Sequence, residues 1–195
     1  PDTSFNGTGY VITSLGGTFD TVTSLAIRSD GKIVAAGYVN PPTAGGTRIV
    51  VLRYHPNGAL DTSFGVGGSA TALIGFQSRA WALALQSDGK IVVAGDAATS
   101  NYGDFSVARF TEDGSLDTSF SGDGILWTSV GIGKSIDTAR SVAVQQDGKI
   151  VVAGDTSYTD QRLIVVRYNT DGSLDTSFDG DGIISTYIAS NAAAG

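Results

Sequence analysis

The sequence predicts an all-β protein, a β-propeller built of four-stranded antiparallel blades, and three observations lead to this fold class. The tetrapeptide Asp-Thr-Ser-Phe begins at Asp2, Asp61, Asp117 and Asp175, so its successive copies are 59, 56 and 58 residues apart. A second motif, Asp-Gly-Lys-Ile-Val, begins at Asp30, Asp88 and Asp147. No segment sustains the apolar spacing of an amphipathic helix. A period just under sixty residues with strand-like segments is typical of a tandem repeat array.

The second repeat shows the expected strands most clearly. Ala80 to Leu85 and Ile91 to Gly95 are apolar runs joined by a turn that contains Asp88-Gly89, and Asp-Gly between two such runs is a strong hairpin signal. Phe105 to Phe110 and Ile125 to Val130 are the third and fourth strands. The second run is continuous rather than alternating, which indicates a strand covered on both faces.

The other repeats follow the same plan. First strands are expected at 25–28 and 142–145, second strands at 33–37 and 150–154, and third strands at 49–54 and 163–168. We divide residues 1–195 into repeat 1 (2–60), repeat 2 (61–116), repeat 3 (117–174), and a terminal outer strand with its tail (175–195). A β-solenoid has shorter repeats, and an immunoglobulin-like sandwich has no internal repeat, so both are disfavoured.

The count of four tetrapeptides against three pentapeptides predicts an extra outer strand. Tyr10 to Leu15 reads as a fourth strand without the three strands that should precede it, whereas Ile183 to Ile188 completes the last blade. Propellers typically have four to eight blades. We therefore expect the ring to be closed by further sequence or by oligomerisation, which makes the chain a homo-oligomer or part of a longer chain.

Three segments carry a resemblance to a known family. These are Gln86 to Gly95, Val107 to Phe110, and Asp113 to Phe120, with the sequences QSDGKIVVAG, VARF and DGSLDTSF. They resemble the bacterial delta-60 repeat family, a β-propeller domain of unknown function, although the first repeat departs mildly at His55 to Leu60. The resemblance implies a propeller fold and a bacterial, extracellular or cell-surface setting, and it supplies no catalytic residues.

Composition narrows the possible functions. The net charge is −7 and the 12 basic residues are scattered, whereas nucleic-acid surfaces gather Lys and Arg on one face. No apolar run is long enough to span a bilayer. Cysteine is absent, which excludes disulfides and thiolate chemistry. Acidic, Ser/Thr/Gly-rich β repeats without cysteine are associated with secreted and surface proteins. We therefore expect no nucleic acid, no membrane insertion and an extracellular or cell-surface location.

Two repeated residues are expected to form one ion pair per blade. Arg53, Arg109 and Arg167 each precede an aspartate, respectively Asp61, Asp117 and Asp175, by eight residues. A buried arginine requires a carboxylate partner, so pairing is favoured over two exposed charges. The phenylalanine of each tetrapeptide is expected to pack between blades.

Binding is expected in the loops that differ between repeats, because variable loops on a rigid scaffold are where binding usually resides. These loops follow the second and fourth strands, and their candidate ligand-binding residues are Tyr38, Phe76, Arg79, Trp81, Tyr102, Arg140 and Tyr158. Thr23 and Arg140 stand at the position of Trp81 in the sister repeats. The tryptophan therefore contacts a ligand or sugar ring, or else it covers a blade edge.

Catalysis, cofactors and metals find little support in the sequence. His55 and Glu112 are each single in the chain and stand in variable turns, so a hydrolytic triad is not indicated. Turns such as Asn169 to Asp175 resemble calcium loops, yet their ligand positions are not kept between repeats. We predict a non-enzymatic module that binds protein or glycan without cofactor or metal; the alternatives are a carbohydrate-binding propeller and a propeller domain of a larger enzyme.

Overall fold

The computed structural model describes residues 1–42, 45–98, 103–131, 135–157 and 161–187. These residues contain twelve strands: β1 (Phe19–Ile27), β2 (Ile33–Asn40), β3 (Arg48–Tyr54), β4 (Ser69–Ala72), β5 (Gln77–Leu85), β6 (Ile91–Ala98), β7 (Gly103–Phe110), β8 (Ile125–Thr128), β9 (Ile136–Val144), β10 (Ile150–Ser157), β11 (Arg162–Tyr168) and β12 (Ile183–Tyr187). No helix in the described part is long and apolar enough to cross a membrane.

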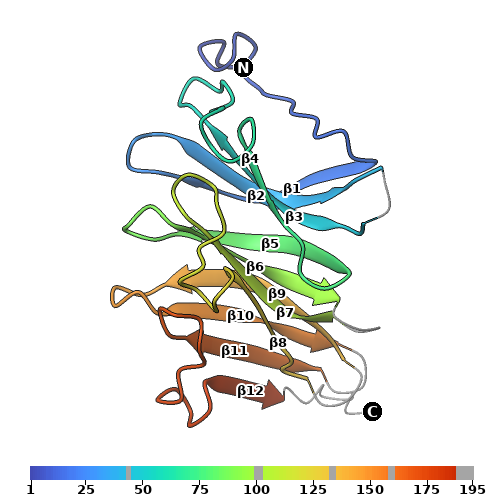
Figure 1. Cartoon of the computed structure of the whole chain (residues 1–195), viewed down its shortest axis with the longest axis vertical. Helices are drawn as coiled ribbons and strands as arrows, with labels where there is room; N and C mark the ends of the chain where they lie inside the picture. Colours follow the sequence, from blue (N-terminus) through green and yellow to red (C-terminus); the bar gives the residue numbers. More distant parts are fainter. Residues whose placement is uncertain (43–44, 99–102, 132–134, 158–160, 188–195) are drawn as a thin grey trace, which may run out of the picture.

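The strands form three four-stranded antiparallel sheets in chain order, β1 to β4, β5 to β8 and β9 to β12, which we call blades 1, 2 and 3. The blades follow one another along the long axis of the molecule (Figure 1). β5 contacts both β1 and β9, so the first strands gather along one line. In a closed propeller that line is the central axis. The chain is therefore an unclosed arc of three propeller blades, as the sequence predicts.

Two apolar cores lie between neighbouring blades. The core between blades 1 and 2 includes Ile49 and Phe64 from the first and Ile91 and Phe110 from the second, and all four side chains are fully buried. The core between blades 2 and 3 is built in the same way around Phe105. The central strand β6 is thus covered on both faces, which explains why its sequence is a continuous apolar run.

A β-bulge in each first strand sets the shape of the inner edge. The pairing register shifts around Thr23 in β1, Trp81 in β5 and Arg140 in β9. Opposite each bulge stands a glycine, and a Cβ at Gly95 would collide with the carbonyl oxygen of Arg79. The bulge lets polar residues before it continue the ladder, so the first strands begin earlier than the apolar runs alone suggest.

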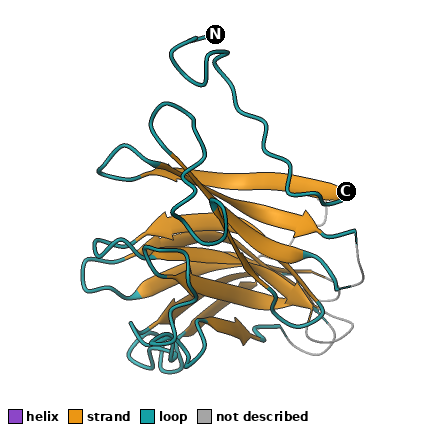
Figure 2. Cartoon of the chain, turned by 45° about the horizontal axis from the view of Figure 1, so that its top comes forward, coloured by secondary structure: helices purple, strands orange, loops and turns teal. Residues whose placement is uncertain are grey.

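The sequence places an extra outer strand at Tyr10 to Leu15. This segment belongs to none of the three sheets, because the described part of the chain has no unpaired third strand beside it. Residues 1–18, which we call the N-terminal arm, instead form a loop beyond blade 1 and then run along that blade (Figure 2). The sheets also divide the chain differently from the repeats. The Asp-Thr-Ser-Phe copies at Asp61, Asp117 and Asp175 each lie between the third and fourth strands of one blade, and the copy at Asp2 lies in the N-terminal arm.

Candidate functional site

The repeated arginines and aspartates meet in every blade. The Nε atom of Arg53 donates to Oδ2 of Asp61 at 2.7 Å, Arg109 donates to Asp117 at 2.7 Å, and Arg167 donates to Asp175 at 2.6 Å. The third strand presents the arginine and the turn to the fourth strand presents the aspartate. The pair therefore ties the outer strand of a blade to the strand before it.

A lysine and a phenylalanine complete this arrangement. Lys32 of the Asp-Gly-Lys motif donates from Nζ to Asp61 at 2.9 Å, and Lys149 does the same to Asp175 at 2.8 Å. The guanidinium of each arginine lies over the ring of the phenylalanine in its own tetrapeptide, at 4.7, 4.5 and 4.4 Å from the ring centre in blades 1, 2 and 3. We call the arginine, aspartate, lysine and phenylalanine of one blade its clasp.

The clasp aspartates stay ionised far into acid. Burial alone would raise the pKa of Asp117, but hydrogen bonds from Ser119 and the charge of Arg109 lower it to about 2. The pKa of Asp61 is lowered by the same balance, in which bonds from Ser63, Lys32 and Arg53 outweigh burial. Each clasp thus holds a charged carboxylate between two cations across the neutral pH range.

The arginine and phenylalanine of a clasp also contact the next blade. Arg109 donates from Nη1 to the backbone carbonyl of Thr170 at 2.6 Å, as Arg53 does to that of Glu112 at 2.5 Å. The ring of Phe120 lies 3.1 Å from where a Cβ of Gly172 would stand, and Gly172 has a φ of 91°. A glycine in this turn is required both by its positive φ and by the ring that covers it.

A second group of residues gathers at the other end of the blades, on the face of the variable loops. The rings of Tyr38 and Trp81 pack edge to face with centroids 5.7 Å apart, and the guanidinium of Arg79 lies 5.9 Å from the Tyr38 ring centre. The indole N–H of Trp81 donates to Asp96, which also lies 3.8 Å from Arg79. Four side chains from blades 1 and 2 thus form one contact group.

Blade 3 adds a charged pair to this group. Arg140 donates from Nε to Asp155 at 2.5 Å and interacts electrostatically with Asp96. Burial raises the pKa of Asp96 above its usual range, although Trp81, Arg79 and Arg140 act in the opposite direction. We call Tyr38, Arg79, Trp81, Asp96, Arg140 and Asp155 the axial cluster, because all of them stand on the first two strands of a blade.

The axial cluster unites four of the predicted ligand-binding residues and adds two that the sequence reasoning missed. Tyr38, Asp96 and Asp155 occupy one equivalent position in β2, β6 and β10, directly after the glycine that faces the bulge. That recurring Gly-Tyr or Gly-Asp step was the available signal. Phe76 lies outside the cluster and is 69 % exposed. Tyr102 and Tyr158 lie outside the described residues.

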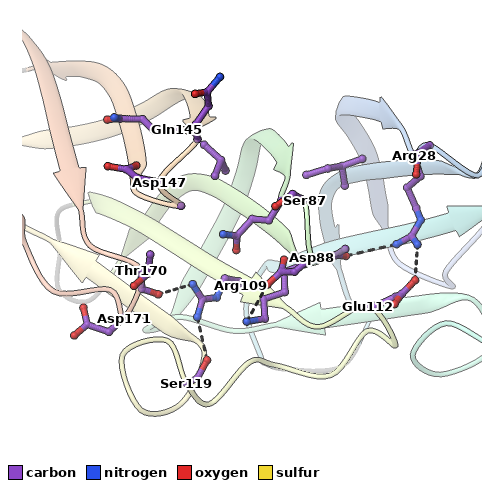
Figure 3. A pocket seen from close by; sticks show the side chains of 18 of the residues that line it. Arg28, Ser87, Asp88, Arg109, Glu112, Ser119, Gln145, Asp147, Thr170 and Asp171 are labelled. Atoms are coloured by element: carbon purple, nitrogen blue, oxygen red, sulfur yellow. Dashed lines mark hydrogen bonds and ion pairs between the residues drawn. The ribbon is translucent and has the colours of Figure 1, made fainter.

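A pocket of about 1340 Å³ lies on the opposite face, among the turns that recur from blade to blade. It is lined by the first turns of all three blades, as Figure 3 shows for Arg28, Asp88 and Asp147. Arg28 is paired there with Glu112 at 2.5 Å, and Arg109 is held by its clasp. Its two labelled arginines are therefore engaged in contacts between blades.

The acidic turns use their carboxylates for local hydrogen bonds. Asp171 accepts from the backbone N–H and the hydroxyl of Ser173 at 2.9 and 2.7 Å, and Asp113 accepts from the N–H of Ser115 at 2.9 Å. These are Asx-turn contacts, which stabilise the turn without a metal. Within the described ranges, no three His, Cys, Asp or Glu residues lie close enough together to hold a metal ion.

Comparison with known proteins identifies the repeat. A family model described as domain of unknown function (DUF5122) beta-propeller matches residues 28–64, 86–120 and 145–178. The three matches cover more than half of the chain, and each runs from the first turn of a blade to the phenylalanine of its clasp. A search of curated proteins finds none that matches this chain.

Proposed function

Because the chain belongs to this β-propeller family of unknown function, we propose that it is a non-enzymatic, secreted or surface-exposed module for binding or assembly, with the loop face as its contact surface. The observation that carries the proposal is the axial cluster. At equivalent bulges the three blades present Thr23, Trp81 and Arg140, which share no chemistry. If this bulge position only supported the fold, the same residue type would serve in all three blades, as arginine does in the clasps. The difference between blades points to recognition.

The chemistry of the axial cluster favours a polar ligand. Bulges re-aim side chains and are frequent next to functional sites. Trp81 and Tyr38 supply amphipathic aromatic surface, while Arg79 and Asp96 supply charged donors and acceptors. Aromatic rings beside carboxylates and arginines suit sugar hydroxyls as well as the side chains of a protein partner. A glycan is therefore our more specific candidate ligand.

The secreted or surface location and the repeat type belong to the same proposal. A chain with no cysteine, a net charge of −7 and many Ser, Thr and Gly residues fits such a setting. The spacing of 56 to 59 residues between tetrapeptides supports assignment to the delta-60 type.

The second candidate function, a domain of a larger enzyme, receives no support from the one group that resembles a triad. His55 lies 3.7 Å from Asp61, and the Ser63 hydroxyl donates to the same aspartate at 2.6 Å. In a hydrolytic triad the histidine stands between serine and aspartate. Here the aspartate stands between the other two and belongs to a clasp. Hydrolytic activity in the isolated or the full-length protein would support the enzyme candidate.

The test of the proposal is binding to an array of immobilised glycans with three forms of the protein. Wild type is expected to bind, and Trp81→Ala is expected to lose at least about tenfold in affinity, since an aromatic anchor of this kind contributes well over 1.4 kcal/mol. Trp127→Ala is the matched control, because Trp127 is 54 % exposed on the outer strand of the same blade. Glycan binding unaffected by Trp81→Ala would refute the role of the axial cluster.

If no glycan binds, the carbohydrate version of the proposal fails. The protein version is then tested by measuring which surface proteins bind wild type but not Trp81→Ala, with Trp127→Ala again as the control.

A further inference from the structure

The two ends of the array expose the two halves of one interface. On the side that faces the next blade, Ile49 and Phe105 are fully buried, whereas Leu163 at the same position of blade 3 is 52 % exposed. On the side that faces the preceding blade, Leu83 is 9 % exposed and the equivalent Leu25 of blade 1 is 65 % exposed. Apolar residues that two blades cover are left uncovered at the ends.

The polar half of the interface is incomplete at the same places. Arg167 keeps its bonds to Asp175 and to the hydroxyl of Ser177. Arg53 and Arg109 donate in addition to a carbonyl of the following blade, and within the described residues Arg167 has no such bond. The accepting carbonyls belong to Glu112 of blade 2 and Thr170 of blade 3, each three residues after the arginine of its own blade, and the equivalent residue of blade 1 is Pro56. Donor and acceptor are thus on opposite ends of the chain.

The N-terminal arm packs on the first-blade turn that contains Asn57 and Gly58, and it makes there the contacts that a clasp turn makes on the following blade. The N–H of Asn6 donates to the carbonyl of Asn57 at 2.8 Å, as the N–H of Ser121 donates to that of Asp171 at 2.7 Å. Asn6 has a φ of 52°, and Ser121 and Asp179 each have 54°. The Phe5 ring lies 3.0 Å from where a Cβ of Gly58 would stand. The arm therefore occupies the site on the Asn57-Gly58 turn into which the clasp turn of another blade would fit, and we call this site the socket.

A contact between two hydroxyl groups indicates which residue of blade 3 would meet Tyr54 of blade 1. Between blades 2 and 3, the hydroxyls of Thr128 and Tyr168 lie 2.7 Å apart. Between blades 1 and 2, the equivalent positions are Ala72 and Phe110, so both hydroxyls are missing together. Blade 1 presents Tyr54, which now meets Thr13 of the arm at 2.7 Å. The equivalent residue on the free strand β12 is Thr186, which is exposed and matches Tyr54.

We propose that two copies of this chain associate head to tail, with the blade 3 face of each copy on the blade 1 face of the other. The clasp turn Asp175 to Asp179 of the incoming copy takes the socket from the arm. Arg167 then donates to the Pro56 carbonyl, Thr186 meets Tyr54, and Leu163 and Leu25 become buried. Two such contacts close a ring of six blades, which lies within the usual range of four to eight.

A second copy is the occupant that the chain itself specifies. The chain already makes this interface twice, between blades 1 and 2 and between blades 2 and 3. The outer faces of blades 1 and 3 carry the equivalent residues of its two sides. The arm is the smaller occupant: it holds blade 1 by the backbone bonds of Asn6 and Thr18, the Phe5 ring on Gly58, the Thr13 hydroxyl and the packing of Leu15. It brings neither a clasp arginine nor a sheet. The proposal deepens the assembly half of the proposed function, and its test uses no loop-face ligand.

The test is sedimentation equilibrium of the whole chain over a range of concentrations. We expect a reversible monomer–dimer equilibrium between 19.9 kDa and twice that mass. Deletion of residues 1–15 should tighten the dimer, because the deletion removes the competitor for the socket. Leu163→Glu should weaken it about 100-fold or more, since an unpaired buried charge costs several kcal/mol. Trp127→Glu is the control, because this exposed residue lies on neither end face.

A residue-level variant pair tests the register. Thr186→Ala should weaken the dimer by leaving the Tyr54 hydroxyl without its partner, and Thr186→Ala with Tyr54→Phe should recover most of the affinity by copying Ala72 and Phe110. A chain that stays monomeric with and without residues 1–15 would overturn the proposal. So would a dimer that Leu163→Glu and Trp127→Glu affect equally.

Discussion

The clasps of blades 2 and 3 contain the same residue types in the same geometry, but only one of them has a blade to grip. The Arg109 side chain is 3 % exposed and donates to Thr170 of blade 3, whereas the Arg167 side chain is 20 % exposed. The distance from the arginine Nε to the aspartate Oδ2 is nearly the same in the two blades, at 2.7 Å in blade 2 and 2.6 Å in blade 3. The clasp is thus assembled inside one blade and is then used between two.

This comparison separates two contributions to stability. The contacts within a blade give the clasp its shape, and they are present in blade 3 although no further blade covers it. The following blade adds the bond to a backbone carbonyl and removes the last exposure of the cation. A variant that removes a clasp should therefore be more costly in blade 2 than in blade 3.

The largest expected effect is that of Arg109→Ala, which leaves the buried Asp117 without its main partner. Breaking a buried ion pair from one side costs about 3–5 kcal/mol of unfolding free energy. Arg167→Ala removes the same group from the open clasp and should cost clearly less, because solvent reaches that site. Urea unfolding of both variants measures the difference. Equal losses would show that the following blade contributes nothing to the clasp.

The next effect is that of Gly172→Ala, in the turn that receives the Phe120 ring. The positive φ and the close ring together should cost about 2–3 kcal/mol. Gly122→Ala isolates the backbone part, because Gly122 has a φ of 89° and nothing within 4 Å of an added Cβ. That control should lose about 1 kcal/mol. If thermal unfolding shows the same loss for both, the ring contact is not a constraint.

A smaller effect is expected at the hydroxyl pair between blades 2 and 3. Tyr168→Phe and Thr128→Ala each remove one partner of a contact that is worth about 1 kcal/mol. The double variant copies Phe110 and Ala72 from the neighbouring interface, so a double-mutant cycle should give a coupling of about 0.5–1.5 kcal/mol. Independent losses that simply add would show that the 2.7 Å contact carries no energy.

The smallest effect is a gain in stability. Ser106 is fully buried and its hydroxyl has no hydrogen-bond partner in the described part of the chain, while Val50 and Ile164 stand at the equivalent positions. Ser106→Val should therefore raise the unfolding free energy by about 0.5–1 kcal/mol. Ser106→Ala serves as the variant without added volume. A loss of stability in both would mean that the hydroxyl serves a purpose in this core.

Much of the fold could be predicted because each blade repeats the same local signals. The Asp-Gly turns, the continuous second strands and the eight-residue spacing of Arg and Asp define the sheets and the arginine–aspartate pairs without any long-range information. The role of the clasp between blades could not be predicted, because it depends on backbone carbonyls of the next blade, which carry no sequence signature. Asp96 and Asp155 were missed for a related reason: a bulge places them beside Trp81 and Arg140, and bulges follow from pairing register.

The central claim is that one repeated interface holds the blades together and is left half-formed at the end of blade 3. Amide hydrogen exchange tests it most directly, at a protein concentration where sedimentation shows a monomer. The N–H of Ser121 donates to Asp171 of the next blade at 2.7 Å, whereas the equivalent N–H of Asp179 has no acceptor among the described residues. We predict that Ser121 exchanges at least about 100-fold more slowly than Asp179. Equal exchange at the two sites would contradict the account.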